Sequence, residues 1–215
     1  MNPARVLVVD DSAVVRRIVS STLAAAPGIE VVGTAPDGRR ALDRITLLRP
    51  DVVTLDVEMP VLDGIATLRE LRRTHPELPV IMFSTLTERG ASTTLEALSL
   101  GASDYVAKPE GTGSADAAAA LVRRELVPRV RALAARARLP RGRARPQAAD
   151  DAPAAPITTR PGSGSPVRAV AIGTSTGGPT ALEVVLGGLP ESIGVPVFVV
   201  QHMPPVFTRH MAERL

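Results

Sequence analysis

The sequence predicts an α/β protein with two parts, each built on a parallel sheet. Short runs of β-branched residues alternate with helix-like segments over residues 5–122. After residue 167 a second alternation of the same kind begins, with a glycine-rich turn behind its first strand-like run. The strand-like runs are apolar throughout rather than alternating, which is typical of parallel strands that helices cover on both faces.

The first part contains five strand-and-helix units. We expect its strands at 5–9, 29–34, 51–55, 79–83 and 104–107, and its helices near 12–26, 37–49, 64–74, 89–100 and 114–127. Five such units form an open, doubly wound, five-stranded parallel sheet. The strand order 2-1-3-4-5, which is common in sheets of this kind, would place the first and third strands side by side.

The second part contains a single βαβ unit. Its strands are expected at 167–173 and 195–200, with one helix near 178–188 and another from 207. We therefore expect residues 167–215 to form the start of a second, Rossmann-like α/β domain.

The composition excludes several classes of protein. Hydrophobic residues make up 45% of the chain and charged residues 22%, which are proportions of a globular protein rather than a disordered one. Cysteine is absent, so disulfides, thiolate metal sites and cysteine nucleophiles are excluded. No apolar run is long enough for membrane insertion, and no secretory signal follows Met1. A cytoplasmic location is therefore expected.

The middle of the chain differs in charge and in proline content. Residues 123–145 hold nine arginines and one acid, Glu125, and residues 140–166 hold six prolines. The helix before this segment is expected to fray or kink near Pro128. A DNA-binding surface and a solvated helix end with a linker are both compatible with the arginines, and we favour the second. The expected domains are a first α/β domain at 1–122, a linker at 123–166 and the start of a second α/β domain at 167–215. No DNA partner is expected.

Three carboxylates fall at the ends of predicted strands. Asp10 and Asp11 follow the first strand, and Asp56 follows the third. Because ligands bind beyond the carboxyl ends of parallel strands, we expect these side chains to converge. Clustered carboxylates repel one another unless a cation neutralises them, and oxygen ligands in this number suit Mg²⁺. The alternative is that two of them cap a helix and the third lies in a turn.

Two further polar residues follow the remaining strands and make the pattern specific. Ser84 follows the fourth strand and Lys108 the fifth, so a hydroxyl and an ammonium group are available at the same edge for a phosphoryl group on Asp56. The full pattern comprises Asp10-Asp11, Asp56, Met59-Pro60, Asp63-Gly64, Ser84, Tyr105 and Lys108-Pro109. It resembles the response-regulator receiver domain, which has a flavodoxin-like fold, over about residues 1–122.

The resemblance implies that Asp56 accepts phosphate from a histidine kinase. Mg²⁺ would be ligated by Asp11 and Asp56, helped by the backbone carbonyl of Glu58, with Asp10 acting mainly through water. Ser84 and Lys108 would contact the acyl phosphate.

Two other features of the pattern carry implied roles. Tyr105 matches the switch aromatic of the receiver family, and a half-buried packing tyrosine is the alternative. The Lys108–Pro109 bond is expected to be cis, because bonds before proline tolerate that isomer.

The glycine-rich turn at 173–178, Gly-Thr-Ser-Thr-Gly-Gly, leaves three interpretations open. It can bind an anion through backbone N–H groups at a helix N-terminus. It also fits G-x-S-x-G, which would make Ser175 a nucleophile. The third interpretation is a tight turn without chemistry, in which Pro179 starts the helix.

His202 favours the nucleophile. It follows the strand at 195–200, and consecutive strands of a right-handed βαβ unit lie in one sheet, usually as near neighbours. Ser175 and His202 would then meet at the same edge, where the imidazole can take the hydroxyl proton as general base.

The two motif sets together closely resemble the chemotaxis protein-glutamate methylesterases of CheB type. The segments that carry the second resemblance are AIGTSTGGPTAL and QHMPPVFTRHMAERL. The resemblance implies a response regulator in which Ser175 is the nucleophile, His202 the general base and Thr176 an active-site neighbour. It also implies a hydrolase of glutamate γ-methyl esters on the cytoplasmic domains of chemoreceptors, which deamidates glutamines as well and needs no cofactor for the ester reaction.

One departure from the family leaves a second function open. The family has a third triad residue, an Asp in a glycine-rich segment far downstream, and no such segment occurs before Leu215. We therefore expect a C-terminally truncated chain. The alternative function is a phosphoacceptor receiver module without catalysis.

Overall fold

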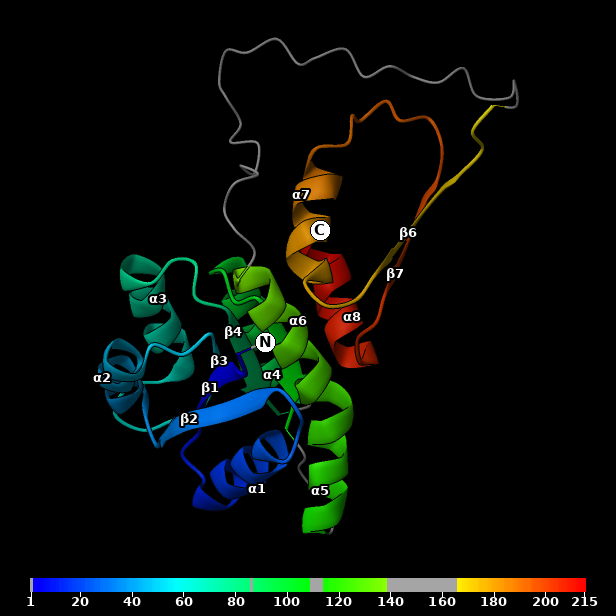
Figure 1. The fold of residues 1–215 in the computed structure, drawn as a ribbon. Helices are drawn as coiled ribbons and strands as arrows, with labels where there is room; N and C mark the ends of the chain where they lie inside the picture. The colour runs from blue at the N-terminus through cyan, green and yellow to red at the C-terminus, as the bar shows by residue number, and fades with distance from the viewer. Residues whose placement is uncertain (1, 86, 109–113, 139–165) are drawn as a thin grey trace.

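The computed structural model describes residues 2–85, 87–108, 114–138 and 166–215. Their first part forms a five-stranded parallel sheet with the strand order 2-1-3-4-5, and their last part forms a two-stranded parallel sheet. Both the α/β class and the strand order 2-1-3-4-5 predicted from the sequence are confirmed. Figure 1 shows the second part lying beside the first.

The elements of the first part follow the predicted alternation closely. They are β1 (Ala4–Val9), α1 (Ala13–Ala24), β2 (Ile29–Ala35), α2 (Gly38–Leu48), β3 (Val52–Asp56), α3 (Gly64–Thr74), β4 (Val80–Ser84), α4 (Glu88–Ser99), β5 (Asp104–Ala107), α5 (Ala115–Leu121), a π-helical turn η1 (Val122–Leu126) and α6 (Val127–Ala137). The second part contains β6 (Val170–Thr174), α7 (Gly178–Gly187), β7 (Val197–Gln201) and α8 (Pro205–Arg214). None of the described helices is long and apolar enough to cross a bilayer.

Helices cover both faces of the five-stranded sheet. Residues of α2, α3 and α4 pack on one face around Leu55 and Met82, and residues of α1, η1 and α6 pack on the other around Val8 and Ile81. All four of these strand residues are almost fully buried. Their exclusion from water explains why the strands are apolar along their whole length.

The last helix of the first part continues past Pro128 instead of fraying there. Residues 115–137 run through α5, η1 and α6 without a break, and the N–H of Val127 bonds to the carbonyl of Val122 in the wider π turn. A wider turn relieves the clash of a proline ring with the carbonyl four residues earlier. Buried Val130 and Leu133 hold α6 on the sheet. Residues 123–137, which the sequence analysis assigned to the linker, are therefore helical and packed on the five-stranded sheet.

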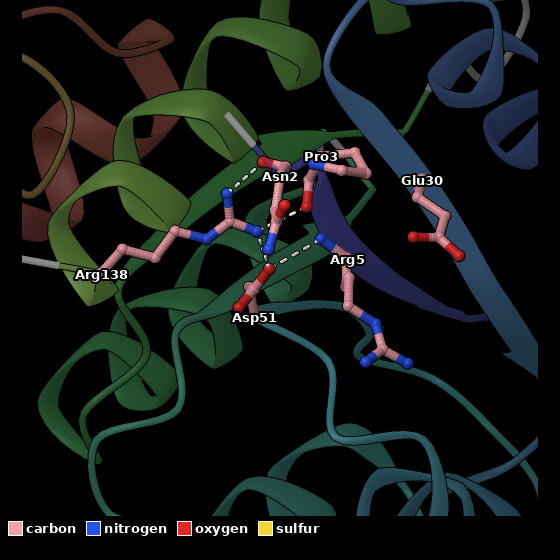
Figure 2. Close-up of a pocket in the computed structure, with 6 residues that line it drawn as sticks. All are labelled: Asn2, Pro3, Arg5, Glu30, Asp51 and Arg138. Carbon is pink, nitrogen blue, oxygen red and sulfur yellow. Dashed lines mark hydrogen bonds and ion pairs between the residues drawn. The ribbon is translucent and has the colours of Figure 1, made fainter.

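The end of α6 is fastened to the N-terminal edge of the sheet. The Arg138 guanidinium donates to the carbonyls of Asn2 and Pro3 and pairs with Asp51, which also accepts a hydrogen bond from the backbone of Arg5 (Figure 2). Arg138, one of the arginines of the basic segment, therefore has a structural role. The proline-rich segment expected at 140–166 lies outside the described residues, except for Pro166, with which the second part begins. The Lys108–Pro109 bond, which was expected to be cis, also lies outside them.

The second part docks on the first through a small aromatic and aliphatic core. Phe207 of α8 is fully buried and stacks on Tyr105 of β5, with ring centroids 4.7 Å apart. Leu182 of α7 and Met211 of α8 belong to the same buried cluster as Leu95 of α4. The faces of β6 and β7, in contrast, stay largely exposed.

We predict that Phe207→Ala loosens this docking. Truncating a buried phenylalanine costs about 3–5 kcal/mol, because its contacts and its exclusion from water are both lost. Amide hydrogen exchange in β6, β7 and α8 should accelerate, while exchange in β1 and β3 should stay slow. The matched control is Phe198→Ala, whose ring is 60% exposed. Equal acceleration by both variants would contradict the docking role of Phe207.

Candidate functional site

The predicted acidic cluster forms at the carboxyl ends of β1 and β3. The side chains of Asp10, Asp11 and Asp56 each offer an oxygen, and these atoms lie within 4.8 Å of one another. The ammonium group of Lys108 reaches into the cluster and lies 2.7 Å from Asp56 Oδ2 and 3.1 Å from Asp10 Oδ2. Asp10 and Asp56 are each 1% exposed.

Burial dominates the electrostatics of this cluster. Loss of water raises the pKa of Asp56 from 3.8 to about 6, and the negative charge of Asp10 adds to the rise, although Lys108 opposes it. Burial also raises the pKa of Asp10 against the effect of Lys108. Burial alone would lower the pKa of Lys108, but its hydrogen bonds and charge interactions with Asp56 and Asp10 outweigh that effect and raise it. The cluster is therefore a site where a further positive charge would be stabilising.

The residues beside the carboxylates hold them in place without neutralising them. Ser12 is the N-cap of α1, so the capping alternative considered for Asp10 and Asp11 does not apply. The Oδ1 atom of Asp10 accepts from the Ser12 backbone, and that of Asp56 accepts from the Glu58 backbone at 3.2 Å. A side chain at Gly64 would collide with the Asp56 carbonyl, which explains the Asp63-Gly64 pair of the sequence pattern.

Ser84 lies at the same edge of the sheet, as predicted. It ends β4 next to the strand of Asp56, it is 2% exposed, and its carbonyl accepts from the backbone of Lys108 at 2.7 Å. A hollow of about 360 Å³ is lined by Asp11, Asp56, Glu58, Ser84, Thr85 and Lys108, among others. Its size and its mixture of carboxylates, hydroxyls and one ammonium group are compatible with a small phosphate-sized anion together with a cation.

The donor set of the cluster fits a hard divalent cation. All three candidate side chains are carboxylates, and the described residues offer no sulfur or imidazole ligand beside them. Mg²⁺ prefers such oxygen ligands, usually one or two carboxylates plus water. The acidic cluster is thus compatible with Mg²⁺ binding.

Ser175 and His202 lie together at the carboxyl edge of the second sheet. Ser175 follows β6, His202 follows β7, and these strands pair in parallel. The Ser175 hydroxyl lies 3.5 Å from His202 Nδ1. Both side chains are exposed and line one hollow with Thr174 and Gln201. The spatial relation expected from the βαβ geometry is present.

The turn that carries Ser175 has the backbone of a sharp strand-to-helix junction. Gly177 has a φ of +73°, which glycine adopts readily, and Gly178 donates to the Ser175 carbonyl. Pro179 lies in the first turn of α7, as predicted. Thr176 is exposed on this turn. Burial raises the pKa of Asp104 at the start of β5, and the side chain of Thr176 lowers it by less.

Two features of this region were missed by the sequence analysis. Gln201, directly before His202, bonds to both loops of the second site. Asp104 is buried and pairs with Arg129 at 3.2 Å. Burial raises its pKa, and the side chain of Thr176 in the second part opposes that rise. The only sequence signal for Asp104 was an acidic residue at the start of a predicted strand. No sequence signal indicated that Thr176 would act on it.

We predict that Asp56→Asn stabilises the protein at neutral pH. The folded state raises the Asp56 pKa to about 6, so above that pH the ionised carboxylate lowers the free energy of unfolding by its full amount. Below the pKa that Asp56 has in the unfolded state, this destabilisation disappears. Without divalent cations the asparagine variant should be more stable by roughly 1–3 kcal/mol at pH 8. That difference should shrink as the pH falls from about 6 to 4. Urea unfolding at a series of pH values measures it, and a gain that stays constant with pH would contradict the shift.

Comparisons with known proteins agree with this arrangement of two sites. A family model described as response regulator receiver domain matches residues 6–119, and one described as CheB methylesterase matches residues 170–215. The response regulator domain of Thermotoga maritima CheB is similar in structure, with a TM-score of 0.56 and 42% identity, over 62% of this chain and 98% of that one.

Curated relatives extend the similarity to both parts. A protein-glutamate methylesterase/protein-glutamine glutaminase of Nocardioides sp. is 51% identical over 98% of this chain and 57% of its own length. The protein of the same name from Bacillus subtilis is 46% identical over 98% of this chain and 59% of its own length. The chain thus spans less than two thirds of the length of these relatives. With a receiver model over more than half of its residues and CheB-type similarity along nearly all of them, the chain belongs to the response regulators of the CheB family.

Proposed function

We propose that the protein is a chemotaxis response regulator whose phosphorylation controls a serine carboxylic ester hydrolase. The observation that carries the hydrolase is the 3.5 Å approach of the Ser175 hydroxyl to His202 Nδ1 at the end of two paired strands. The names of the relatives support methyl esters of protein glutamate and amides of protein glutamine as the substrate class. The resemblance to the chemotaxis methylesterases adds chemoreceptors as the proteins that carry these side chains. Since those side chains belong to the receptors' cytoplasmic domains, the proposed location is the cytoplasm. The proposed domains are a receiver at 1–122, a linker at 123–166 and a catalytic segment at 167–215. The first residues of the proposed linker, 123–137, form a helix packed on the receiver sheet.

The ester reaction uses Ser175 and His202 in two stages. The Ser175 oxygen attacks the ester carbonyl while His202 takes the hydroxyl proton, and His202 then gives that proton to the departing methoxide. The products of this stage are methanol and an acyl group on Ser175. Water then attacks the acyl group, again with His202 as base, which frees the glutamate carboxylate and restores the serine. The neighbouring Thr176 forms part of the edge at which the substrate binds.

Phosphorylation is assigned to Asp56 with a histidine kinase as donor. The Asp56 carboxylate attacks the phosphorus atom, and the phosphoryl group leaves the donor. Lys108, 2.7 Å from Asp56 in the unmodified protein, is placed to pair with the new phosphoryl oxygens, and the Ser84 hydroxyl to donate to them. Mg²⁺ held by Asp11 and Asp56, with Asp10 behind them, would balance the charge of the transferred group.

Control of the hydrolase by the receiver rests on the docked arrangement. Tyr105 stacks on Phe207 of α8, and α8 begins three residues after His202. A hollow of about 350 Å³ is lined by residues of both parts, among them Tyr105, Arg129 and His202. A receiver packed this close limits access of a receptor helix to the base. Phosphate on Asp56 shifts the Ser84–Tyr105 edge toward a second state and weakens the docking.

We predict that acetyl phosphate with Mg²⁺ phosphorylates the wild-type protein and not Asp56→Asn. Intact-mass measurement should show one added phosphoryl group, and chelation of Mg²⁺ should prevent its appearance. Lys108→Ala should retain Mg²⁺ binding but lower the phosphorylation rate by about tenfold or more, since a charge-assisted contact is lost. Glu191→Gln, far along the sequence in a loop of the second part, is the control. Uptake of phosphate by Asp56→Asn would refute the assignment.

We predict that release of methanol from methylated receptor fragments depends on Ser175 and His202. Ser175→Ala and His202→Ala should each lower the rate at least about 10³-fold, because nucleophile and base act as a unit. A phosphodonor should raise the wild-type rate and leave that of Asp56→Asn unchanged. A protein that takes up phosphate but releases no methanol would be a receiver without catalysis, and the hydrolase proposal would fail.

A further inference from the structure

The side chain of Gln201 bridges the two loops that carry Ser175 and His202. Its Oε1 atom accepts from the Thr174 hydroxyl at 2.5 Å. Its Nε2 group donates to the Ser175 carbonyl at 3.0 Å and to the His202 carbonyl at 3.4 Å. The amide thus connects the end of β6, the nucleophile loop and the base loop at once.

The paired strands place Gln201 where it can do this. Gln201 is the last residue of β7 and is the register partner of Thr174, the last residue of β6. The backbone ladder continues one step further, from the His202 N–H to the Thr174 carbonyl at 3.0 Å. A side chain at Gly178 would collide with Gln201 Oε1, so the glycine leaves the space that the amide fills. The glycine-rich motif and the Gln-His pair are in this way parts of one packed unit.

The amide is the chemical group that these contacts require. The position needs one acceptor, for the Thr174 hydroxyl, and donors for two carbonyl oxygens, and a carboxamide supplies both kinds of atom. A carboxylate of the same size would accept from Thr174 but would repel the carbonyls of Ser175 and His202. An apolar side chain would remove all three of these hydrogen bonds.

The relative position of Ser175 and His202 depends on the hydrogen bonds that the Gln201 side chain makes to their loops. Ser175 and His202 are both exposed, so packing of their own side chains does little to fix the distance between them. That distance is 3.5 Å, at the outer limit of a hydrogen bond. A displacement of about 1 Å at a reacting centre can cost roughly 10²-fold in rate.

We propose that Gln201 is a positioning residue that holds the Ser175 and His202 loops in register for proton transfer. The inference rests on the proposed hydrolase function and adds a residue to it. Gln201 acts through the two backbones, because its amide atoms are engaged by Thr174, Ser175 and His202. Its loss should therefore lower reactivity of Ser175 without changing the affinity for substrate.

A fluorophosphonate probe tests this in the intact protein. On labelling, the Ser175 oxygen bonds to phosphorus, fluoride leaves, and the hydroxyl proton passes to His202, so the rate reports the pair directly. In Gln201→Met, which keeps the side-chain size, we expect the labelling rate constant to fall about 10- to 100-fold. Its rise with pH, which follows the base, should flatten. With receptor substrate, kcat should fall and KM should change less than about twofold.

Matched variants separate positioning from a general loss of structure. Thr174→Val should slow labelling and Thr174→Ser, which keeps the hydroxyl, should restore it. Thr180→Val, at an exposed position of α7, should have no effect. Gln201→Glu keeps the acceptor but lacks the donors, so it should be as slow as Gln201→Met. Thermal unfolding of each variant should match the wild type.

The outcomes distinguish this inference from the function on which it rests. If wild-type labelling does not depend on Ser175, as judged by Ser175→Ala, the hydrolase proposal itself fails. If the wild type is labelled at Ser175 and Gln201→Met reacts at the same rate with the same pH profile, the Gln201 inference alone is overturned. A lower unfolding temperature that accompanies slow labelling in both Gln201→Met and Thr174→Val would give the bridge a structural role and would also overturn it.

Discussion

The pairing of parallel strands is the constraint on which both candidate sites depend. Neighbouring parallel strands end at the same edge, so polar residues placed just after each strand must face a common space. In the first sheet this brings Asp56 beside Asp10 and lets Lys108 reach them from the end of β5. In the second sheet the same rule brings Ser175 to His202 across 27 positions of sequence. One geometric rule thus supplies a phosphoacceptor pocket and a nucleophile–base pair with unrelated chemistry.

The two candidate sites differ in how far their side chains are exposed to solvent. Asp10 and Asp56 are buried, and the resulting rise in the Asp56 pKa makes the acidic cluster favourable for a cation. The Ser175–His202 pair is open to solvent, so its geometry depends on hydrogen bonds such as those that the Gln201 side chain donates to the loop carbonyls. The contact of Tyr105 with Phe207 joins the two regions through a buried core. A structural change at the sheet edge that carries Asp56 can therefore alter the docking of the second part, because the Tyr105–Phe207 core lies between that edge and the loop of His202.

Much of the fold was predictable because its signals are local. Apolar runs marked every strand, and polar residues at their ends marked the acidic cluster, Ser84, Lys108, Ser175 and His202. The course of the helix through Pro128 was not predictable, since a π turn depends on the balance between proline sterics and the burial of Val130 and Leu133. Nor was the docking of Phe207 on Tyr105, which joins residues more than a hundred positions apart. The role of Gln201 required the strand register, which pairs it with Thr174 and which sequence alone does not determine.

The central claim is that the loops after β6 and β7 are held together at one edge in the folded protein. The chain has no cysteine, so Ser175→Cys combined with His202→Cys introduces a single thiol pair. Disulfide formation needs Cα atoms no more than about 7 Å apart, so its rate under mild oxidation measures proximity directly. The account predicts rapid formation of a bond between positions 175 and 202, mapped by mass spectrometry, and slow formation in denaturant. A native protein that forms this bond no faster than the unfolded chain would contradict it.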